Sequence, residues 1–264
     1  MHKYIHLYKI SVQDMFSDAG KTFIWILVGA SESFVMAFTW LIVSKGHDSI
    51  GSMTISQVIT YYFYLFITWY IIGGTFWHLI SNSIRRGELS NTLLKPIFPY
   101  AKDILLEQGW KTFGLISGIP ILILFFLVFS GNLSIEFSLI HLIISLPSII
   151  LSTLIFALLQ FIIGNLTHWF QKVDGVYTVY NTTSYIFGGA IAPLLLMPLG
   201  IQKAAYLLPF RYTFSFPIEI FQSLISNSQI YLGYFLQVLW LILLIILSRI
   251  LYKKGLQKYE SFGN

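Results

Sequence analysis

The stretch SIRRGELSNTLLKPIFPYAKD, residues 83–103, is a charged, proline-containing insert between two strongly apolar segments. The chain around it has 264 residues, of which 56% are apolar and only 10% are charged. Soluble domains carry about 25% charged residues, so this composition indicates a membrane protein. The insert therefore raises two questions: on which side of the membrane it lies, and what it contacts.

Six segments are apolar and long enough to cross a bilayer, which takes about 20 residues. They are Thr22–Val43, Val58–Ile80, Thr112–Ser130, Leu139–Leu166, Val176–Leu199 and Ile230–Leu251. We expect the fourth to bend at Pro147. The pattern predicts an all-α integral membrane protein, with residues 1–264 forming a single transmembrane domain of six transmembrane helices.

The placement of Lys and Arg predicts the orientation. If the N-terminus lies inside, thirteen of these residues lie on the inner side, and only Lys45, Lys203 and Arg211 lie outside. This asymmetry fits the positive-inside rule, so we expect both termini, the insert (residues 81–111) and the tail (residues 252–264) to be cytoplasmic. The excess of basic residues is then expected to bind anionic lipid headgroups and not nucleic acid.

Three segments outside the spans have patterns of their own. Residues 2–18 repeat apolar side chains at three- and four-residue steps (Ile5, Tyr8, Val12, Met15), which favours a helix along the inner membrane surface over a solvated arm. Within the insert, Leu89, Leu93 and Leu94 predict a short amphipathic helix parallel to the membrane. Residues 193–228 are cut by four prolines into pieces too short to cross, so we expect one or two short re-entrant helices in the outer leaflet.

Motifs for chemistry within the chain are weak. DAGKT at residues 18–22 lacks the glycine that a phosphate-binding loop needs five residues before its final glycine, because Met15 stands there. The six histidines are scattered, no Gly-x-Ser-x-Gly elbow occurs, and cysteine is absent. We therefore expect no catalytic residue, no metal site and no cofactor in this chain.

Glu32 is the residue with the sharpest functional signal, because carboxylates within membrane spans are rare and costly. Small residues surround it in GASESF, residues 29–34, which suits close helix packing. One interpretation places Glu32 on a translocation path together with Asn181 and Thr182 of the fifth span. The other makes Glu32 a structural carboxyl, neutral or hydrogen-bonded to those same two side chains.

Three stretches carry a resemblance to a known family: IRRGELSNTLLKPIFPYA (84–101), SYIFGGAIAPLLLMPLGIQKAAYLLPFRYTFSFPIEIF (184–221) and LYKKGLQKYESFGN (251–264). In order and spacing the chain resembles the permease subunits of type-2 ABC exporters, in the bacterial branch with one six-span permease of about this length. Ile97 and Phe98 depart from the family's pattern between the two prolines of the insert.

The resemblance implies an N-terminal surface helix, a cytosolic coupling helix between spans two and three, and outer re-entrant helices before span six. It also implies a bacterial cell membrane location and a complex with two cytosolic ATPase subunits, which bind ATP and Mg, and with a second permease, identical or a sister chain. The coupling role would fall on eight residues of the insert: Arg85, Arg86, Gly87, Glu88, Leu89, Leu94, Lys95 and Pro96. Of these, Glu88 is the strongest candidate for a partner contact.

Two other classes of function compete with this interpretation. A proton-coupled secondary transporter could use Glu32, but such proteins usually carry inverted repeats and more buried ionisable groups. A membrane-embedded enzyme or substrate-capture subunit would need a catalytic cluster or would lack the insert. A tightly bound soluble ATPase in the purified complex would support the permease interpretation and would count against both alternatives.

Overall fold

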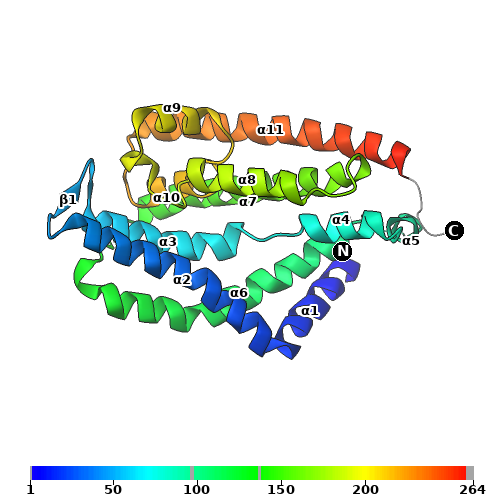
Figure 1. The fold of residues 1–264 in the computed structure, drawn as a ribbon, viewed down its shortest axis with the longest axis horizontal. Coiled ribbons are helices and arrows are strands. Elements are labelled where there is room, and N and C mark those ends of the chain that lie inside the picture. Colours follow the sequence, from blue (N-terminus) through cyan, green and yellow to red (C-terminus); the bar gives the residue numbers. More distant parts are fainter. Residues whose placement is uncertain (1, 96–97, 136–137, 260–264) are drawn as a thin grey trace.

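The computed structural model describes residues 2–95, 98–135 and 138–259, and helices make up most of it (Figure 1). The α-helices are α1 (His2–Ser17), α2 (Ala19–Ser44), α3 (Ile55–Ile72), α4 (Trp77–Arg85), α5 (Leu89–Leu93), α6 (Ala101–Phe129), α7 (Leu139–Asn165), α8 (Asp174–Phe187), α9 (Leu199–Leu207), α10 (Ser215–Phe221) and α11 (Asn227–Lys258). Three 3-10 turns, η1 (Ser130–Asn132), η2 (Leu166–His168) and η3 (Leu194–Leu196), and a two-stranded antiparallel hairpin, β1 (Ser49–Ile50) with β2 (Met53–Thr54), complete it. The predicted all-α membrane class is confirmed, with this hairpin added.

Among the described residues, five helical segments are long and apolar enough to cross a membrane: Ala19–Ser44, Ile55–Arg85, Ala101–Asn132, Leu139–His168 and Asn227–Lys258. The predicted span at residues 176–199 is not among them. Its helix, α8, has 14 residues and ends at Phe187. At 1.5 Å per residue α8 is about 21 Å long, against about 30 Å of hydrocarbon. Because the chain leaves the helix at Gly188, the count of six transmembrane helices is not confirmed.

The bundle has two distinct ends (Figure 1). One end, here called the insert end, holds α4, α5, α1 and the C-terminal end of α11. The opposite end, the hairpin end, holds the β-hairpin, α9 and α10. The short helices η3, α9 and α10 occupy the proline-cut segment 193–228, so this segment adds short helices and irregular backbone at the hairpin end.

Helix α3 is the centre of the fold. Its segment is 61% buried, against 22–33% for the other four long segments, and Figure 1 shows it between α2 and the α7–α8 layer. A capping box starts the helix, because Thr54 and Gln57 each bond the other's backbone N–H. Helix α3 contacts α2 and α6 as well as α7 and α10, so it joins the two sides of the bundle.

The second predicted span is broken. Residues 55–85 form α3 and α4 with four non-helical residues, 73–76, between them. The helix of the third long segment, α6, begins at Ala101, eleven residues before the predicted Thr112. It continues through Pro120. Likewise α7 continues through Pro147. The insert therefore consists of the end of α4, the five-residue α5, connecting turns, and the first three turns of α6.

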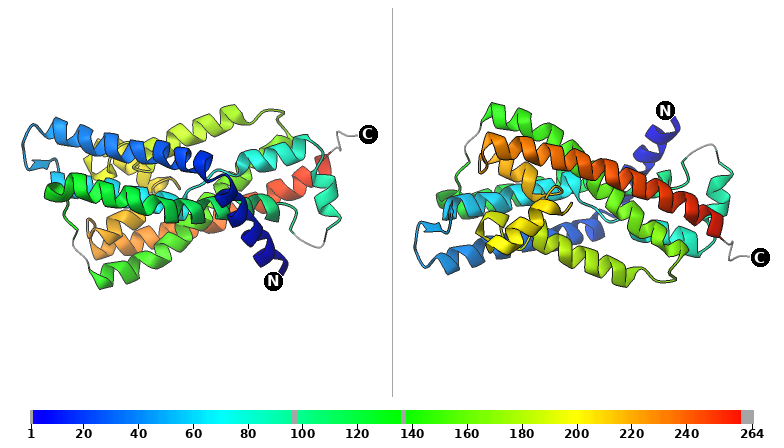
Figure 2. Two further views of the ribbon diagram at one scale, coloured as in Figure 1. Left: turned by 90° about the horizontal axis from the view of Figure 1, so that it is seen from below. Right: turned by 90° about the horizontal axis from the view of Figure 1, so that it is seen from above.

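Helix α1 lies across the start of α6 and meets α2 in a V at Asp18 (Figures 1 and 2). The Ser11 hydroxyl donates to the Leu105 carbonyl at 2.8 Å, and the Tyr8 and Thr112 hydroxyls are 2.7 Å apart. Gly109 allows this approach, because a Cβ there would lie 2.1 Å from Ser11 Oγ. Part of the face expected to lie on the membrane is thus packed on α6.

Candidate functional site

A cavity of about 260 Å³ lies between α2, α3, α8 and the loop before α10. Its lining is largely aromatic and aliphatic, with one carboxylate: Trp25, Val28, Gly29, Glu32, Ser33, Tyr62, Leu65, Phe66, Trp69, Tyr70, Tyr185, Ala190 and Phe214. Gly29 of α2 faces Tyr70 of α3, and a Cβ at this position would lie 3.4 Å from the Tyr70 hydroxyl, an ordinary contact distance. Cavities with apolar walls and few polar groups are typical of sites for small or amphipathic molecules.

Glu32 is half-buried in this cavity, and its partner comes from α8. The Tyr185 hydroxyl donates to Glu32 Oε2 at 3.1 Å. Asn181 lies one helical turn before Tyr185 and lines a small adjoining cavity with it, whereas Thr182 is exposed on the outside of α8. The hydrogen bond that the structure gives Glu32 is therefore with Tyr185, a residue that the sequence interpretation did not name. A spacing of four from Asn181, on the same helical face, was the available signal.

Two adjacent tyrosines of α3 hold the backbone that follows α8. The Tyr61 hydroxyl donates to the Gly189 carbonyl at 2.9 Å, and the Tyr62 hydroxyl donates to the Ile191 carbonyl at 2.8 Å. Trp40 of α2 donates its indole N–H to the Tyr62 hydroxyl at 3.0 Å. These bonds satisfy non-helical backbone within the bundle, which a low-dielectric surrounding requires. They also fix the cavity wall on the α8 side.

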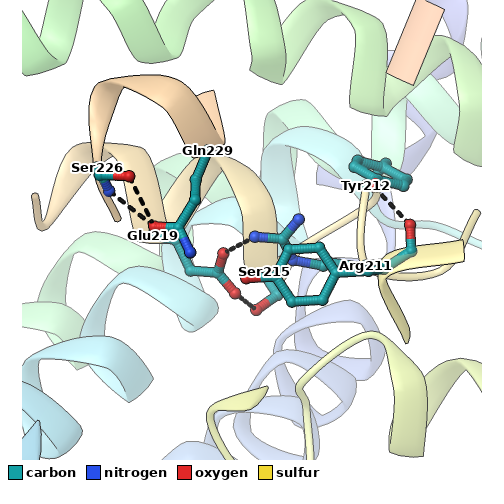
Figure 3. Close-up of polar contacts among 7 residues, drawn as sticks. Arg211, Tyr212, Ser215, Glu219, Ser226 and Gln229 are labelled. Carbon is teal, nitrogen blue, oxygen red and sulfur yellow. Dashed lines mark hydrogen bonds and ion pairs between the residues drawn. The ribbon is translucent and has the colours of Figure 1, made fainter. Parts of the chain in front are cut away.

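A buried ion pair stabilises the segment next to the cavity (Figure 3). Arg211 and Glu219 are 1% and 2% exposed and form a direct pair, and the Ser215 hydroxyl donates to the second carboxylate oxygen of Glu219 at 2.6 Å. The Arg211 guanidinium also lies over the Tyr206 ring, 3.9 Å from its centroid. From the sequence, Arg211 was counted only as an outer-side charge, and its burial against Glu219 was not predicted. The sequence signal for this ion pair was an Arg and a Glu eight residues apart in an otherwise apolar stretch, and it was missed.

A second cavity, about 340 Å³, lies towards the insert end between α4, α6, α7 and α11. Its walls are almost entirely apolar, from Phe76, Phe98, Ile104, Leu154, Ala157, Leu158, Phe161 and Tyr252, with Ser248 and Arg249 at α11. No carboxylate is among the described residues that line it, whereas Glu32 lines the first cavity. The first cavity is therefore the better candidate for selective binding.

The insert is anchored by one leucine and exposes most of its charges. Leu89 of α5 is 0% exposed and packs with Ile80 and Ile84 of α4 and with Tyr100. Leu94, expected on the same apolar face, is 86% exposed because α5 ends at Leu93. The predicted amphipathic face thus reduces to a single buried position in a five-residue helix.

Of the eight predicted coupling residues, five are exposed: Arg85, Arg86, Glu88, Leu94 and Lys95. Gly87 forms the turn between α4 and α5 with φ +73°, and Pro96 lies outside the described residues, as does Ile97. Arg86 and Glu88 are 3.9 Å apart with side chains 71% and 58% exposed. Such a surface pair contributes little to stability, so both charges are available to a partner.

The insert is also tied to the end of α11. Tyr259, Tyr252 and Leu256 pack on the cluster around Leu89. The Tyr259 hydroxyl lies 3.3 Å from the Ser90 backbone nitrogen and 3.2 Å from the Ser90 hydroxyl. Sequence reasoning did not foresee this contact, because it joins residues 169 positions apart. Helix α5 is therefore held by both α4 and the last long helix.

Comparison with known families agrees with this architecture. The family model for ABC-2 family transporter proteins matches residues 31–263, nearly the whole chain. A comparison with curated proteins gives no match. The matched range includes the insert, four of the five long apolar segments in full and the rest of the first from residue 31, and most of the cavity lining, Glu32 included. The chain therefore belongs to the ABC-2 transporter family and is a multi-pass membrane permease of the ABC type.

Proposed function

We propose that this protein is the membrane-spanning subunit of an ATP-driven exporter. It forms the translocation path and pairs with a second permease, identical or a sister chain. Two cytosolic ATPase subunits bind ATP and Mg and act on its insert. The complex lies in a bacterial cell membrane with both termini cytoplasmic, which places the insert end inside.

One observation carries this proposal: the insert presents a fixed, charged surface at the end of two long helices. Leu89 is fully buried while Arg85, Arg86, Glu88 and Lys95 are exposed around it. A loop that served only to connect α4 with α6 would not need this anchor. A rigid, charged projection fits a surface that receives a push from a soluble partner, and transport by such a permease then follows as a rigid-body or helix-shift transition.

The cavity around Glu32 supplies the path. Its aromatic walls suit the apolar part of an amphipathic substrate, and the Glu32 carboxylate suits a cationic or hydrogen-bond-donating group on the same molecule. Helix α3 lines this cavity through Tyr62, Trp69 and Tyr70 and leads directly towards the insert. A movement of the insert therefore reaches the cavity through α4, the non-helical residues 73–76 and α3.

Purification of the permease with its partners tests the proposal. We expect an ATPase to co-purify, and we expect Glu88→Lys to reduce both its binding and its transport-linked hydrolysis, with Glu88→Ala intermediate. Asp174→Ala is a matched control, because Asp174 is an exposed carboxylate at the start of α8. Unchanged assembly and hydrolysis in both Glu88 variants would remove Glu88 from the interface. Vectorial transport by the permease alone, driven by a proton gradient and abolished by Glu32→Gln, would replace the proposal with secondary transport.

A further inference from the structure

The break between α3 and α4 has an unusual backbone. Gly74 has φ +120°, a conformation that side-chain-bearing residues rarely adopt, and Gly73 has its N–H bonded to the Trp69 carbonyl at 2.8 Å. The four residues 73–76 are here called the joint. Because α3 ends before the joint, its last carbonyls have no partners within the helix. Another part of the protein must satisfy them.

Lys111 of α6 provides that partner. Its side chain is 8% exposed, and its Nζ donates to the Ile72 carbonyl at 3.0 Å and to the Ile71 carbonyl at 3.4 Å. A positive charge at a helix C-terminus is favoured both by these hydrogen bonds and by the helix dipole. Lys111 therefore caps α3 from a position about three turns into α6.

Glu107, one turn before Lys111, faces the other part of the joint. It is 7% exposed and interacts with the Thr75 backbone N–H, while its Oε1 atom has no hydrogen-bond partner among the described residues. A Cβ on Gly74 would lie 2.0 Å from that same Oε1 atom. Glu107 and Lys111 are not within ion-pair distance of each other in the described part of the chain, where the pairs are Arg86–Glu88 and Arg211–Glu219. Each charge instead serves the backbone of the joint.

We infer that Lys111 and Glu107 are positioning residues that latch the joint, and that the joint is the pivot through which the insert moves α3. This inference rests on the proposed function. The chain runs from α4 through α5 into α6, so the helices on both sides of the insert meet again at these two side chains. Trp69, which lines the Glu32 cavity, lies one turn before Gly73. A push on the insert thus reaches the cavity wall through a joint whose angle α6 controls.

Hydrogen exchange on the purified permease tests the latch without any partner. Lys111→Met removes the capping ammonium but keeps the chain length, so we expect amide exchange in residues 73–79 to rise about tenfold or more, the effect of losing a hydrogen bond to a charged group. Lys111→Arg, which keeps a charged donor, should restore most of the protection. Lys102→Met is the control, because Lys102 is an exposed lysine of the same helix. Equal exchange in all four proteins would overturn the inference.

Steric complementarity gives an independent test of geometry. Gly74→Ala should raise exchange across the joint, since the new methyl group would collide with the Glu107 carboxylate. Adding Glu107→Ala should relieve the collision and recover part of the protection, while the strain of the positive φ remains. If exchange across the joint in the Gly74→Ala/Glu107→Ala protein rises by the sum of the two single effects, the two residues are not in contact and the geometry described here is wrong.

Transport by the complete complex tests the pivot. With the partner ATPase bound, we expect Lys111→Met to keep ATP hydrolysis and to lower the number of substrates moved per ATP about tenfold, with recovery in Lys111→Arg. If amide exchange in the joint rises in Lys111→Met but transport per ATP does not change, the latch is purely structural and the joint is not the pivot. Absence of any ATPase partner would refute the proposed function, but it would leave the exchange result intact, because that result depends on the permease alone.

Discussion

Neutralising Glu219 should destabilise the protein far more than neutralising Glu88, although both carboxylates form an ion pair with Arg in the structure. The two pairs differ in their surroundings. Arg211 and Glu219 are 1% and 2% exposed, whereas Arg86 and Glu88 are 71% and 58% exposed. The comparison therefore isolates the effect of burial on an otherwise similar interaction.

The expected magnitude follows from the fate of the remaining charge. After Glu219→Gln, Arg211 stays buried beside Tyr206 without a counter-ion, and loss of one partner from a buried pair costs about 3–5 kcal/mol of unfolding free energy. The substitution also removes the charged acceptor of the Ser215 hydroxyl, which donates to Glu219 at 2.6 Å in the wild-type protein. After Glu88→Gln, water solvates Arg86, so the loss should stay below about 1 kcal/mol.

Reversible unfolding of the purified protein in mixed micelles, titrated with denaturing detergent, measures both changes. The double variant Arg211→Met/Glu219→Leu supplies the check on mechanism, because removing both charges should recover most of the stability that Glu219→Gln loses. If Glu219→Gln and Glu88→Gln cost the same, burial is not the deciding factor. If the double variant is as unstable as the single one, the loss comes from packing and not from an unpaired charge.

Three further predictions concern the cavity and the insert. Glu32→Gln should lower transport several-fold while Tyr185→Phe has a smaller effect, measured in proteoliposomes, because the carboxylate and not its hydroxyl partner is the proposed substrate contact. Gly189→Ala should cost about 1–3 kcal/mol in the detergent titration, since Gly189 has φ +82° and its Cβ would lie 2.5 Å from a tyrosine hydroxyl of α3. Leu89→Ala should cost about 2–5 kcal/mol and expose the insert to protease, whereas the exposed Leu94→Ala should change stability by less than about 0.5 kcal/mol.

Hydropathy predicted much of the bundle because long apolar helices must satisfy their own backbone in lipid. It gave helical segments near those of the structure at Thr22–Val43, Leu139–Leu166 and Ile230–Leu251. The predicted span at residues 176–199 is not confirmed, because the sequence stays apolar after α8 has ended at Phe187. The helix stops at the Gly188–Gly189 pair, and the backbone beyond it is held by Tyr61 and Tyr62 of a distant helix. An average over one segment contains no information about such partners.

In the candidate site, too, the sequence predicted the conspicuous residue but not its distant partner. Glu32 was identifiable because one carboxylate in an apolar span is conspicuous in any sequence. Its partner Tyr185 was not, because 153 residues separate the two and a chain with 16 tyrosines offers many hydroxyl groups that could fill this role. The joint was missed for a related reason: Gly73 and Gly74 are visible in the sequence, but their role depends on a contact with Lys111, which the sequence analysis counted only as one of the inner-side charges.

Three of the buried or half-buried carboxylates, Glu219, Glu107 and Glu32, have different roles, and the difference bears on function. Glu219 is matched by Arg211 and holds irregular backbone between α9 and α10. Glu107 lies at the joint, where α3 has stopped and α4 has not begun. Both compensate for backbone that leaves the helix. Glu32 does not, because α2 is continuous from Ala19 to Ser44 and has no free backbone groups near Glu32 to satisfy.

Glu32 also lacks a counter-ion within 4.0 Å among the described residues, and a single tyrosine hydroxyl is its hydrogen-bond partner there. A half-buried carboxylate of this kind is costly unless something else offsets the cost. Since its side chain lines the cavity, a cationic or hydrogen-bond-donating group on a molecule that enters the cavity would supply the missing compensation under the proposed function. This is the physical reason for placing Glu32, and neither of the other two carboxylates, on the path of the substrate.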